Sequence, residues 1–350
     1  MSQFLQLHLL TAYPPANLNR DDVGRPKTAV VGGVTRLRVS SQSLKRAWRT
    51  SSLFRDALAG AMGTRTKQAG KEVLETLLAS GVEQAQAQKI VEQVASQLGK
   101  VEESGTTGQL VHLGPEELEG IRQLARRLAT ERRGPTEEEL KLFRDKPHAA
   151  DIALFGRMVA DATQFNIEAA CQVAHAVTVH KAEVEDDFFT AVDDLNDPHQ
   201  PDSDRGAGHM GETGFGAGLF YLYFCLNWDL LLENLDGDAE TAEVAVRVLT
   251  EAACKVAPTG KQNSFASRAY ASYGLAERGT EQPRSLVAAF LRPVTGSDPL
   301  GDAVAALEGT CSRFDAVYGQ GDVERYSFSA VDGRGNLAEL QAFLVGGRRA

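Results

Sequence analysis

The chain has 350 residues, of which 43% are hydrophobic and 24% are charged, and its formal net charge is −10. These values are ordinary for a globular protein and exclude a largely disordered chain. No apolar run approaches the roughly 18 residues of a membrane helix, and the N-terminus lacks a signal-peptide pattern, so we expect no membrane association. Four widely spaced cysteines without a C-x-x-C pair predict reduced thiols in a cytoplasmic protein, with no metal site and no cofactor.

The N-terminal part of the chain predicts two strands, a long loop and a helix. Residues 4–12 alternate partly and predict a strand, and residues 34–39 predict a short second strand with one basic face. The loop of residues 13–33 between them is rich in proline and glycine, and loops of this length are often functional. The serine pair that follows can cap a helix over residues 41–62.

The middle of the chain predicts a helical insertion and an exposed excursion. Residues 65–160 are rich in helix-forming residues and contain no strand pattern. Residues 171–182 and 217–228 predict strands, and the Asp-, Gly- and Pro-rich residues 183–216 between them predict a long exposed excursion. The helices expected within the insertion are 71–80, 83–99, 115–132, 136–145 and 150–160.

The C-terminal part predicts a helix over residues 239–255, an irregular polar segment over 259–278, a strand near 284–290 and a helix over 299–318. Strands and helices do not alternate regularly along the chain, so the order predicts an α+β fold rather than a parallel α/β fold. We expect a small antiparallel sheet with helices on one face, carrying the two insertions.

A basic window, defined as residues 19–49, is the most informative feature. It contains eight basic and only two acidic residues, so its net charge is +6 while the other 319 residues carry −16. The window is suited to hold a phosphodiester chain. Its arginine and lysine side chains carry positive charge, the N-terminus of the serine-capped helix offers N–H groups, and Gly32–Gly33 allow the backbone to approach closely. A solvated basic face is the alternative. The basic residues are Arg20, Arg25, Lys27, Arg36, Arg38, Lys45, Arg46 and Arg49.

Other polar motifs give incomplete signals for catalysis. Asp21–Asp22 and Asp193–Asp194 allow a two-metal nuclease reading, although Asp21 and Asp22 are equally suited to pair with the surrounding arginines. His175 and His180 fall on opposite faces of a strand, so we interpret them as solvated or core histidines rather than a metal pair. The sequence has no complete dinucleotide, P-loop or nucleophile-elbow motif.

Two apolar features remain to be placed. Phe188 and Phe189 are adjacent, so on a strand we expect one to serve the core and the other to be free to stack on a base or wedge between bases. Met158 lies in a helical pattern and is by default a core residue.

A motif within the basic window resembles a known family. Residues Asn19–Ala47 read NRDD…K-x-A-x-x-GG…R-x-R-V-SSQSLKRA, which strongly resembles the N-terminus of the CasC family. The resemblance continues in order through Asp151–Met158, Ala174–Val177 and Phe189–Leu195, and covers about two-thirds of the chain. The SSQSLKRA block is highly specific in combination.

CasC proteins are the repeated, non-catalytic backbone subunits of the type I-E CRISPR surveillance complex, Cascade, which acts in antiviral defence. The resemblance implies an RRM-like (ferredoxin-like) palm formed by residues 1–59, 171–182 and 217–350, with helical fingers at 60–170 and a β-hairpin thumb at 183–216. It implies that copies stack head to tail on the guide CRISPR RNA, hold its phosphates and present its bases for pairing with the target DNA strand. Other Cascade subunits and the effector nuclease-helicase are the further partners implied.

The matching positions also imply the site residues. The thumb residues Phe188 and Phe189 are the candidates for a base wedge, with Met158 as a stacking neighbour, and Lys141, Arg144 and Lys146 of the fingers are the candidates for contact with target DNA. Two alternatives stay open, a metal-dependent ribonuclease acting through Asp21 or Asp22 and a structural filament whose basic window binds a neighbour's acidic surface. The guide-RNA candidates are Asn19, Arg20, Lys27, Ser40, Gln42, Lys45, Arg46 and Arg49.

Overall fold

An antiparallel sheet forms the centre of the computed structural model, which describes residues 2–102, 105–159, 162–191 and 209–346. The strands are ordered β11–β10–β1–β9–β7–β3–β2, and β6 and β8 also pair with β9. The predicted α+β class with an antiparallel sheet is confirmed. The strands are β1 (Phe4–Ala16), β2 (Thr28–Val31), β3 (Val34–Val39), β6 (Cys171–Val173), β7 (Ala176–Thr178), β8 (Glu185–Ala191), β9 (His209–Asn227), β10 (Ala271–Gly279) and β11 (Val323–Ser329).

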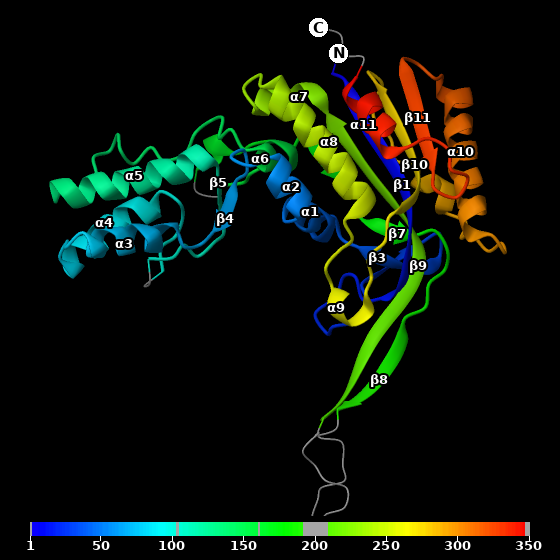
Figure 1. Ribbon diagram of the computed structural model, residues 1–350, viewed down its shortest axis with the longest axis horizontal. Coiled ribbons are helices and arrows are strands. Elements are labelled where there is room, and N and C mark those ends of the chain that lie inside the picture. The colour runs from blue at the N-terminus through cyan, green and yellow to red at the C-terminus, as the bar shows by residue number, and fades with distance from the viewer. Residues whose placement is uncertain (1, 103–104, 160–161, 192–208, 347–350) are drawn as a thin grey trace, which may run out of the picture.

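The sheet separates two hydrophobic cores, and β1 contributes leucines to both of them. Leu7 and Leu9 of β1 belong to one core, and Leu10, which points the other way, belongs to the second. Helices α1 (Ser41–Arg49), α2 (Ser52–Ala57), α6 (Ala150–Phe155), α7 (Trp228–Asn234), α8 (Ala239–Lys255) and α11 (Leu337–Val345) contribute to the first core. Helix α10 (Pro299–Tyr318) and the 3₁₀ turn η2 (Val287–Phe290) cover the opposite face (Figure 1). The prediction that helices cover only one face is therefore wrong.

Residues 64–143, together with Val159, form a helical block with a core of its own, which extends sideways from the sheet (Figure 1). It contains α3 (Ala69–Ala79), α4 (Gln84–Ser96) and α5 (Pro115–Glu131), close to three of the predicted helices. The expectation of no strands is wrong, because β4 (Thr64–Thr66) and β5 (Val111–Leu113) pair where the block joins the rest of the chain.

One predicted helix of the block is also wrong. Residues 136–145 form turns instead of a helix. The carboxylate of Glu139 accepts hydrogen bonds from the Arg133 side chain at 2.8 Å and from the Thr136 N–H at 2.9 Å. These contacts bind the segment back onto the end of α5 and compete with helix formation.

Strands β8 and β9 form a long hairpin that extends away from the sheet (Figure 1), at the position of the predicted excursion. Every residue of β8 is exposed. The expectation that either Phe188 or Phe189 serves the core is therefore wrong. The candidates Asp193–Asp194 lie outside the described residues.

Several other boundaries differ from the predictions because local caps intervene. The helix expected over 41–62 is divided into α1 and α2 because the Ser51 hydroxyl accepts the Phe54 N–H and so begins a second helix. The strand expected over 171–182 is divided into β6 and β7, the irregular segment over 259–278 contains most of β10, and the strand expected near 284–290 is the turn η2. In the polar segment before β10 lies the short helix α9 (Gln262–Phe265), and the turn η1 (Thr163–Phe165) follows α6.

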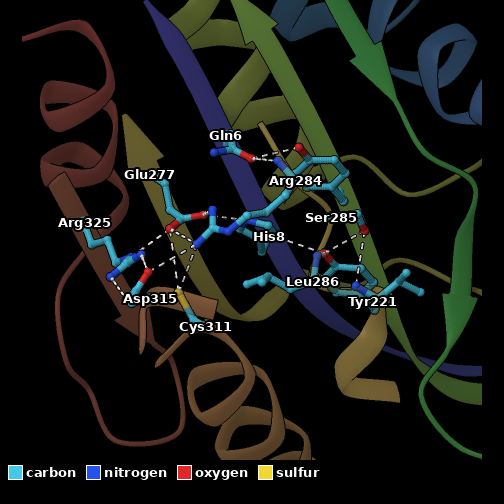
Figure 2. Close-up of polar contacts among 12 residues, drawn as sticks. Gln6, His8, Tyr221, Glu277, Arg284, Ser285, Leu286, Cys311, Asp315 and Arg325 are labelled. Atoms are coloured by element: carbon cyan, nitrogen blue, oxygen red, sulfur yellow. Dashed lines mark hydrogen bonds and ion pairs between the residues drawn. The ribbon is translucent and has the colours of Figure 1, made fainter. Parts of the chain in front are cut away.

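A buried network of charges joins the sheet to α10 (Figure 2). Glu277 of β10 is fully buried and accepts hydrogen bonds from Arg284 at 2.8 Å, Arg325 at 2.7 Å and His8 at 3.2 Å. Arg325 also pairs with Asp315 of α10 at 2.7 Å. Two arginines thus face two carboxylates, and the network connects β1, β10, β11 and α10 without a net charge.

The hydrogen-bond partners of His8 determine which of its ring nitrogens carries the proton. The ionised Glu277 carboxylate can only accept, so Nε2 of His8 donates to it, and Nδ1 of the neutral ring then accepts from the Tyr221 hydroxyl, whose oxygen accepts the Leu286 N–H. Burial lowers the pKa of His8 below its ordinary 6.5 and keeps the ring neutral. Burial opposes ionisation of Glu277, but hydrogen bonds from His8 and Arg284 hold its pKa well below 4.5.

Candidate nucleic-acid interface

The N-terminal loop of residues 17–27 is folded against the base of the hairpin. The buried side chain of Asn17 donates to the carbonyl groups of Gly24 at 2.9 Å and Gly214 at 2.8 Å. Oδ1 of Asp21 accepts the Arg25 N–H at 2.9 Å and closes a tight turn. The loop therefore presents its side chains from a braced backbone.

Helix α1 begins at a fully used cap. Oδ1 of Asn19 accepts the Ser40 N–H at 2.9 Å, and the Ser40 hydroxyl accepts the Ser43 N–H at 3.3 Å. Nδ1 of His175 accepts the Ser41 N–H at 3.0 Å. The expectation that the N–H groups at the helix N-terminus bind phosphate is therefore wrong for these three donors. His175 is exposed, as the interpretation of a solvated histidine predicts, and it also caps the helix.

The two faces of α1 differ in chemistry. Leu44, Ala47 and Trp48 are buried against the sheet. The opposite side carries polar and basic groups, as the spacing of the sequence predicts. Nζ of Lys45 lies 5.6 Å from the centre of the Phe155 ring, which aligns the lysine stem along an aromatic face. The polar and basic side chains of α1 are Gln42, Lys45, Arg46 and Arg49, and Arg20 and Lys27 lie on the adjoining loop and its edge.

Arg36 is an exception within the basic window. Its side chain is fully buried and donates to the carbonyl groups of Thr178 at 3.1 Å and Phe290 at 2.8 Å. It joins β3 to β7 and η2, and it contributes nothing to the charged surface. Counting charges along the window therefore overstates the basic surface by one residue.

A polar cavity of about 430 Å³ opens beside this loop. Asn19, Arg20 and Ser43 line it, together with Thr259 and Gly260 from the polar segment before β10. The sequence identifies this segment only as irregular and polar and assigns it no function. A Cβ at Gly260 would lie 2.3 Å from the Leu18 carbonyl oxygen, so a glycine is required where the two loops meet.

A buried carboxylate joins α1 to the helical block. Asp151 of α6 is fully buried, and its Oδ2 accepts from Nη1 of Arg49 at 3.2 Å and from Nε2 of His112 at 2.9 Å. Its Oδ1 accepts the Gly63 N–H at 2.7 Å. Nδ1 of His112 in turn accepts from Nε of Arg65 at 3.3 Å. Sequence reasoning missed Arg65, because residues 65–160 were interpreted as helical.

The remaining candidates lie away from α1. Phe188 is 66% exposed on β8, and Met158 is 86% exposed beside Leu110 on the helical block, so the default core placement of Met158 is wrong. The block and the hairpin extend in different directions in Figure 1, so one copy of the chain does not bring these side chains together.

Each of the three basic residues expected to contact DNA has an acidic partner. Lys141 pairs with Glu138 at 2.6 Å, Arg144 pairs with Glu116, and Lys146 lies 3.8 Å from Glu233 of α7. Within the residues that the structure describes, no three His, Cys, Asp or Glu side chains lie close enough to hold a metal ion. No helix in the same ranges is long and apolar enough to cross a bilayer.

Comparison with known proteins identifies the family. The CT1975-like protein family matches residues 5–344. The chain belongs to this family. It is similar to a chain of a solved structure described as a pre-nicking CRISPR RNA-guided surveillance complex, with 32% identity, a TM-score of 0.82, and coverage of 97% of this chain and 98% of that chain.

A second solved structure, described as a CRISPR RNA-guided surveillance complex, contains a chain with 30% identity and a TM-score of 0.61, covering 96% of this chain and 92% of that chain. No curated protein matches. The similarities confirm the family prediction made from the Asn19–Ala47 motif, that of a CasC-type subunit.

Proposed function

We propose that the chain is a non-catalytic backbone subunit of a CRISPR RNA-guided surveillance complex, and that several copies bind the phosphates of the guide RNA. The observation that carries this proposal is the basic face of α1 and its adjoining loop on a chain whose net charge is −10. Its membership of the family and its similarity to chains of RNA-guided complexes support the same assignment. Contact with phosphates is independent of sequence, so the bases stay available for pairing.

The site residues divide into ligands and supports. Arg20 and Arg46 are exposed, and Lys45 is half-buried with its charged end over Phe155, so we assign them to the phosphates. Lys27, Gln42 and Arg49 extend this set. Asn19 and Ser40 already hold the start of α1 through their oxygens, so their part is to position the basic side chains.

The finer architecture belongs to the same proposal. The sheet corresponds to an RRM-like palm (residues 1–59, 171–182 and 217–350), the helical block to fingers (60–170) and the hairpin to a thumb (183–216). The separate core of the block and the projection of the hairpin support this division. Phe188 and Phe189 on the thumb would wedge between guide bases held by a neighbouring copy, beside its Met158. Large exposed apolar side chains favour such a covered state.

The partners follow from the assembly. Copies would stack head to tail on the guide in a cytoplasmic type I-E Cascade, with the target DNA strand, the other subunits and the effector nuclease-helicase as partners. Lys141, Arg144 and Lys146 would reach target DNA by exchanging their present carboxylate partners for phosphates. Arginine and lysine pairs this exposed are weak enough to exchange.

The geometry does not favour the ribonuclease alternative. Oδ1 of Asp21 is engaged by the N–H groups of Val23 at 3.1 Å and Arg25 at 2.9 Å, as in a structural turn. A carboxylate that closes its own loop explains Asp21 without catalysis.

The test is co-expression of the chain with its neighbouring subunits and a CRISPR array, followed by extraction and sizing of the bound nucleic acid. We expect a discrete guide-length RNA, and a loss of about tenfold or more with the double variant Lys45→Glu and Arg46→Glu, because two phosphate contacts become repulsive. The matched control is Lys71→Glu with Lys89→Glu, which makes the same charge change on the helical block. Regular assembly without RNA would favour the filament alternative, and Mg²⁺-dependent cleavage lost in Asp21→Ala would favour the ribonuclease.

A further inference from the structure

The junction between α1 and the helical block holds more positive charge than its buried carboxylate can balance. Arg46 and Arg49 come from α1, and Arg65 comes from β4 at the entrance to the block. The carboxylate of Asp151 contacts Arg49 directly and contacts His112, which in turn contacts Arg65. Partial burial, followed by repulsion from Arg49 and Arg46, lowers the pKa of Arg65 below its ordinary 12.5, although the charge of Asp151 acts in the opposite direction. Two guanidinium groups, one in direct contact and one through His112, share this single carboxylate, and an anion would relieve the surplus of positive charge.

The position of Arg65 is fixed by strand pairing and by a histidine. Arg65 of β4 is directly opposite His112 of β5, so both side chains lie on one face of the two-stranded sheet. Nε of Arg65 can only donate a hydrogen bond, so Nδ1 of His112 is the acceptor and the ring proton lies on Nε2. That proton is the one donated to Asp151. Burial lowers the pKa of His112 below 6.5 and keeps this neutral tautomer.

Asp151 therefore holds two arginines that come from different parts of the fold. It contacts Arg49 directly, and it contacts Arg65 through His112. Within the described residues, each of these arginines donates one side-chain hydrogen bond, so most of each planar fork remains for a ligand. Arg65 is exposed, and the side chain of Arg49 is 14% exposed.

We infer that Arg65 is a further ligand for the guide RNA, and that the buried Asp151–His112 pair holds it beside Arg49. This inference rests on the proposed function of guide binding. One stretch of the guide is then contacted from α1 and from the helical block together, so RNA binding fixes the orientation of the block. Asp151 and His112 act through the two arginines and are positioning residues.

The test measures the binding of a single-stranded RNA of fixed length to the full chain as a function of salt concentration. Each lost phosphate contact lowers the slope of log Kobs against log salt by about 0.7 per bound copy for single strands. For Arg65→Ala we expect this smaller slope and a Kd raised about tenfold. The matched control is Arg126→Ala, which removes an exposed arginine of α5 that pairs with Glu119, and its slope should equal that of the unaltered chain.

The outcomes separate the inference from the proposed function. If Arg65→Ala binds like the unaltered chain while Lys45→Ala loses affinity and slope, the inference is overturned and guide binding by α1 stands. If the unaltered chain shows no salt-dependent binding, both are overturned. An unchanged far-ultraviolet circular dichroism spectrum of Arg65→Ala verifies that the helical block of the variant is folded.

The positioning role has its own readout. His112→Gln keeps a donor for Asp151 and an acceptor for Arg65, whereas His112→Leu keeps neither. We expect His112→Leu to reproduce the smaller salt slope, His112→Gln to restore it, and His112→Leu to change nothing further in Arg65→Ala. An equal loss of slope in Gln and Leu variants, or additive losses in the double variant, would contradict the relay.

Discussion

Replacing Glu277 with glutamine removes the charge that holds the network under α10 together, while keeping the size of the side chain. The carboxylate is fully buried and accepts from Arg284, Arg325 and His8. In Glu277→Gln, Arg325 keeps the carboxylate of Asp315 at 2.7 Å, whereas the carboxylate left near Arg284 within the described residues is that of Asp315 at 3.8 Å. One buried charge is therefore left with little compensation.

The expected cost follows from these partners. Breaking a buried pair by removing one member costs about 3–5 kcal/mol. Because Asp315 still neutralises Arg325, and because Arg284 is 26% exposed, we expect the lower end, about 3 kcal/mol. With a urea dependence of about 3 kcal/mol per molar, the unfolding midpoint should fall by about 1 M.

The chain carries a natural reporter for this measurement. Its two tryptophans, Trp48 and Trp228, both lie in the core between the sheet and the helices, so fluorescence follows unfolding of the sheet rather than of the helical block. The control is Glu183→Gln, which removes an exposed partner of Lys181 and should leave the midpoint unchanged. A shift below about 0.3 M for Glu277→Gln would show that the network stabilises far less than its geometry indicates.

Three further predictions concern pH and glycine. In the folded chain the pKa values of His8 and Glu277 lie below their ordinary values of 6.5 and 4.5, so in acid the unfolded chain binds more protons than the folded chain. The urea midpoint should therefore fall as the pH decreases through 6.5 and then through 4.5. A midpoint that rises on acidification would contradict this. Gly32→Ala should destabilise the chain by more than Gly33→Ala. Both glycines have a positive φ, but a Cβ at Gly32 would lie 1.7 Å from a backbone oxygen, whereas a Cβ at Gly33 meets nothing within 4 Å. Equal urea midpoints of the two variants would refute the clash at Gly32. Gly260→Ala should separate the two loops that line the polar cavity and so weaken RNA binding. The slope of log Kobs against log salt should stay the same, because the substitution removes no charge. Unchanged affinity would exclude the polar segment before β10 from the interface.

Much of the fold could be predicted from periodicity. The apolar alternation of β1 and the capped, amphipathic α1 are local patterns, and the structure has both. The two-sided core could not be predicted in this way, because Gln6 and His8 occupy alternate positions of β1 and read as a solvent face. They are buried because partners distant in the sequence, such as Glu277 with His8, satisfy them.

The candidate site was predictable where charge itself is the signal. The spacing of Lys45 and Arg49 predicts that they share one side of α1, yet the charge count could not show that Arg36 is buried. Arg65 could not be predicted as a site residue, because its position depends on a strand pair and on a histidine 47 residues away in the chain. A three-residue strand carries too few positions for alternation to be seen.

The segment Asp151–Met158 shows most directly why residue type alone misplaces function. Asp151 and Arg157 would be surface residues by default, yet both are buried. Arg157 pairs with Glu117 of α5 at 2.7 Å, and both side chains are almost fully enclosed. Gly156, at φ 80°, turns the chain sharply between them. The two charged residues therefore anchor the segment to α1 and α5 from inside, and this anchoring leaves the apolar Met158 on the surface, where the proposed contact with a guide base requires it.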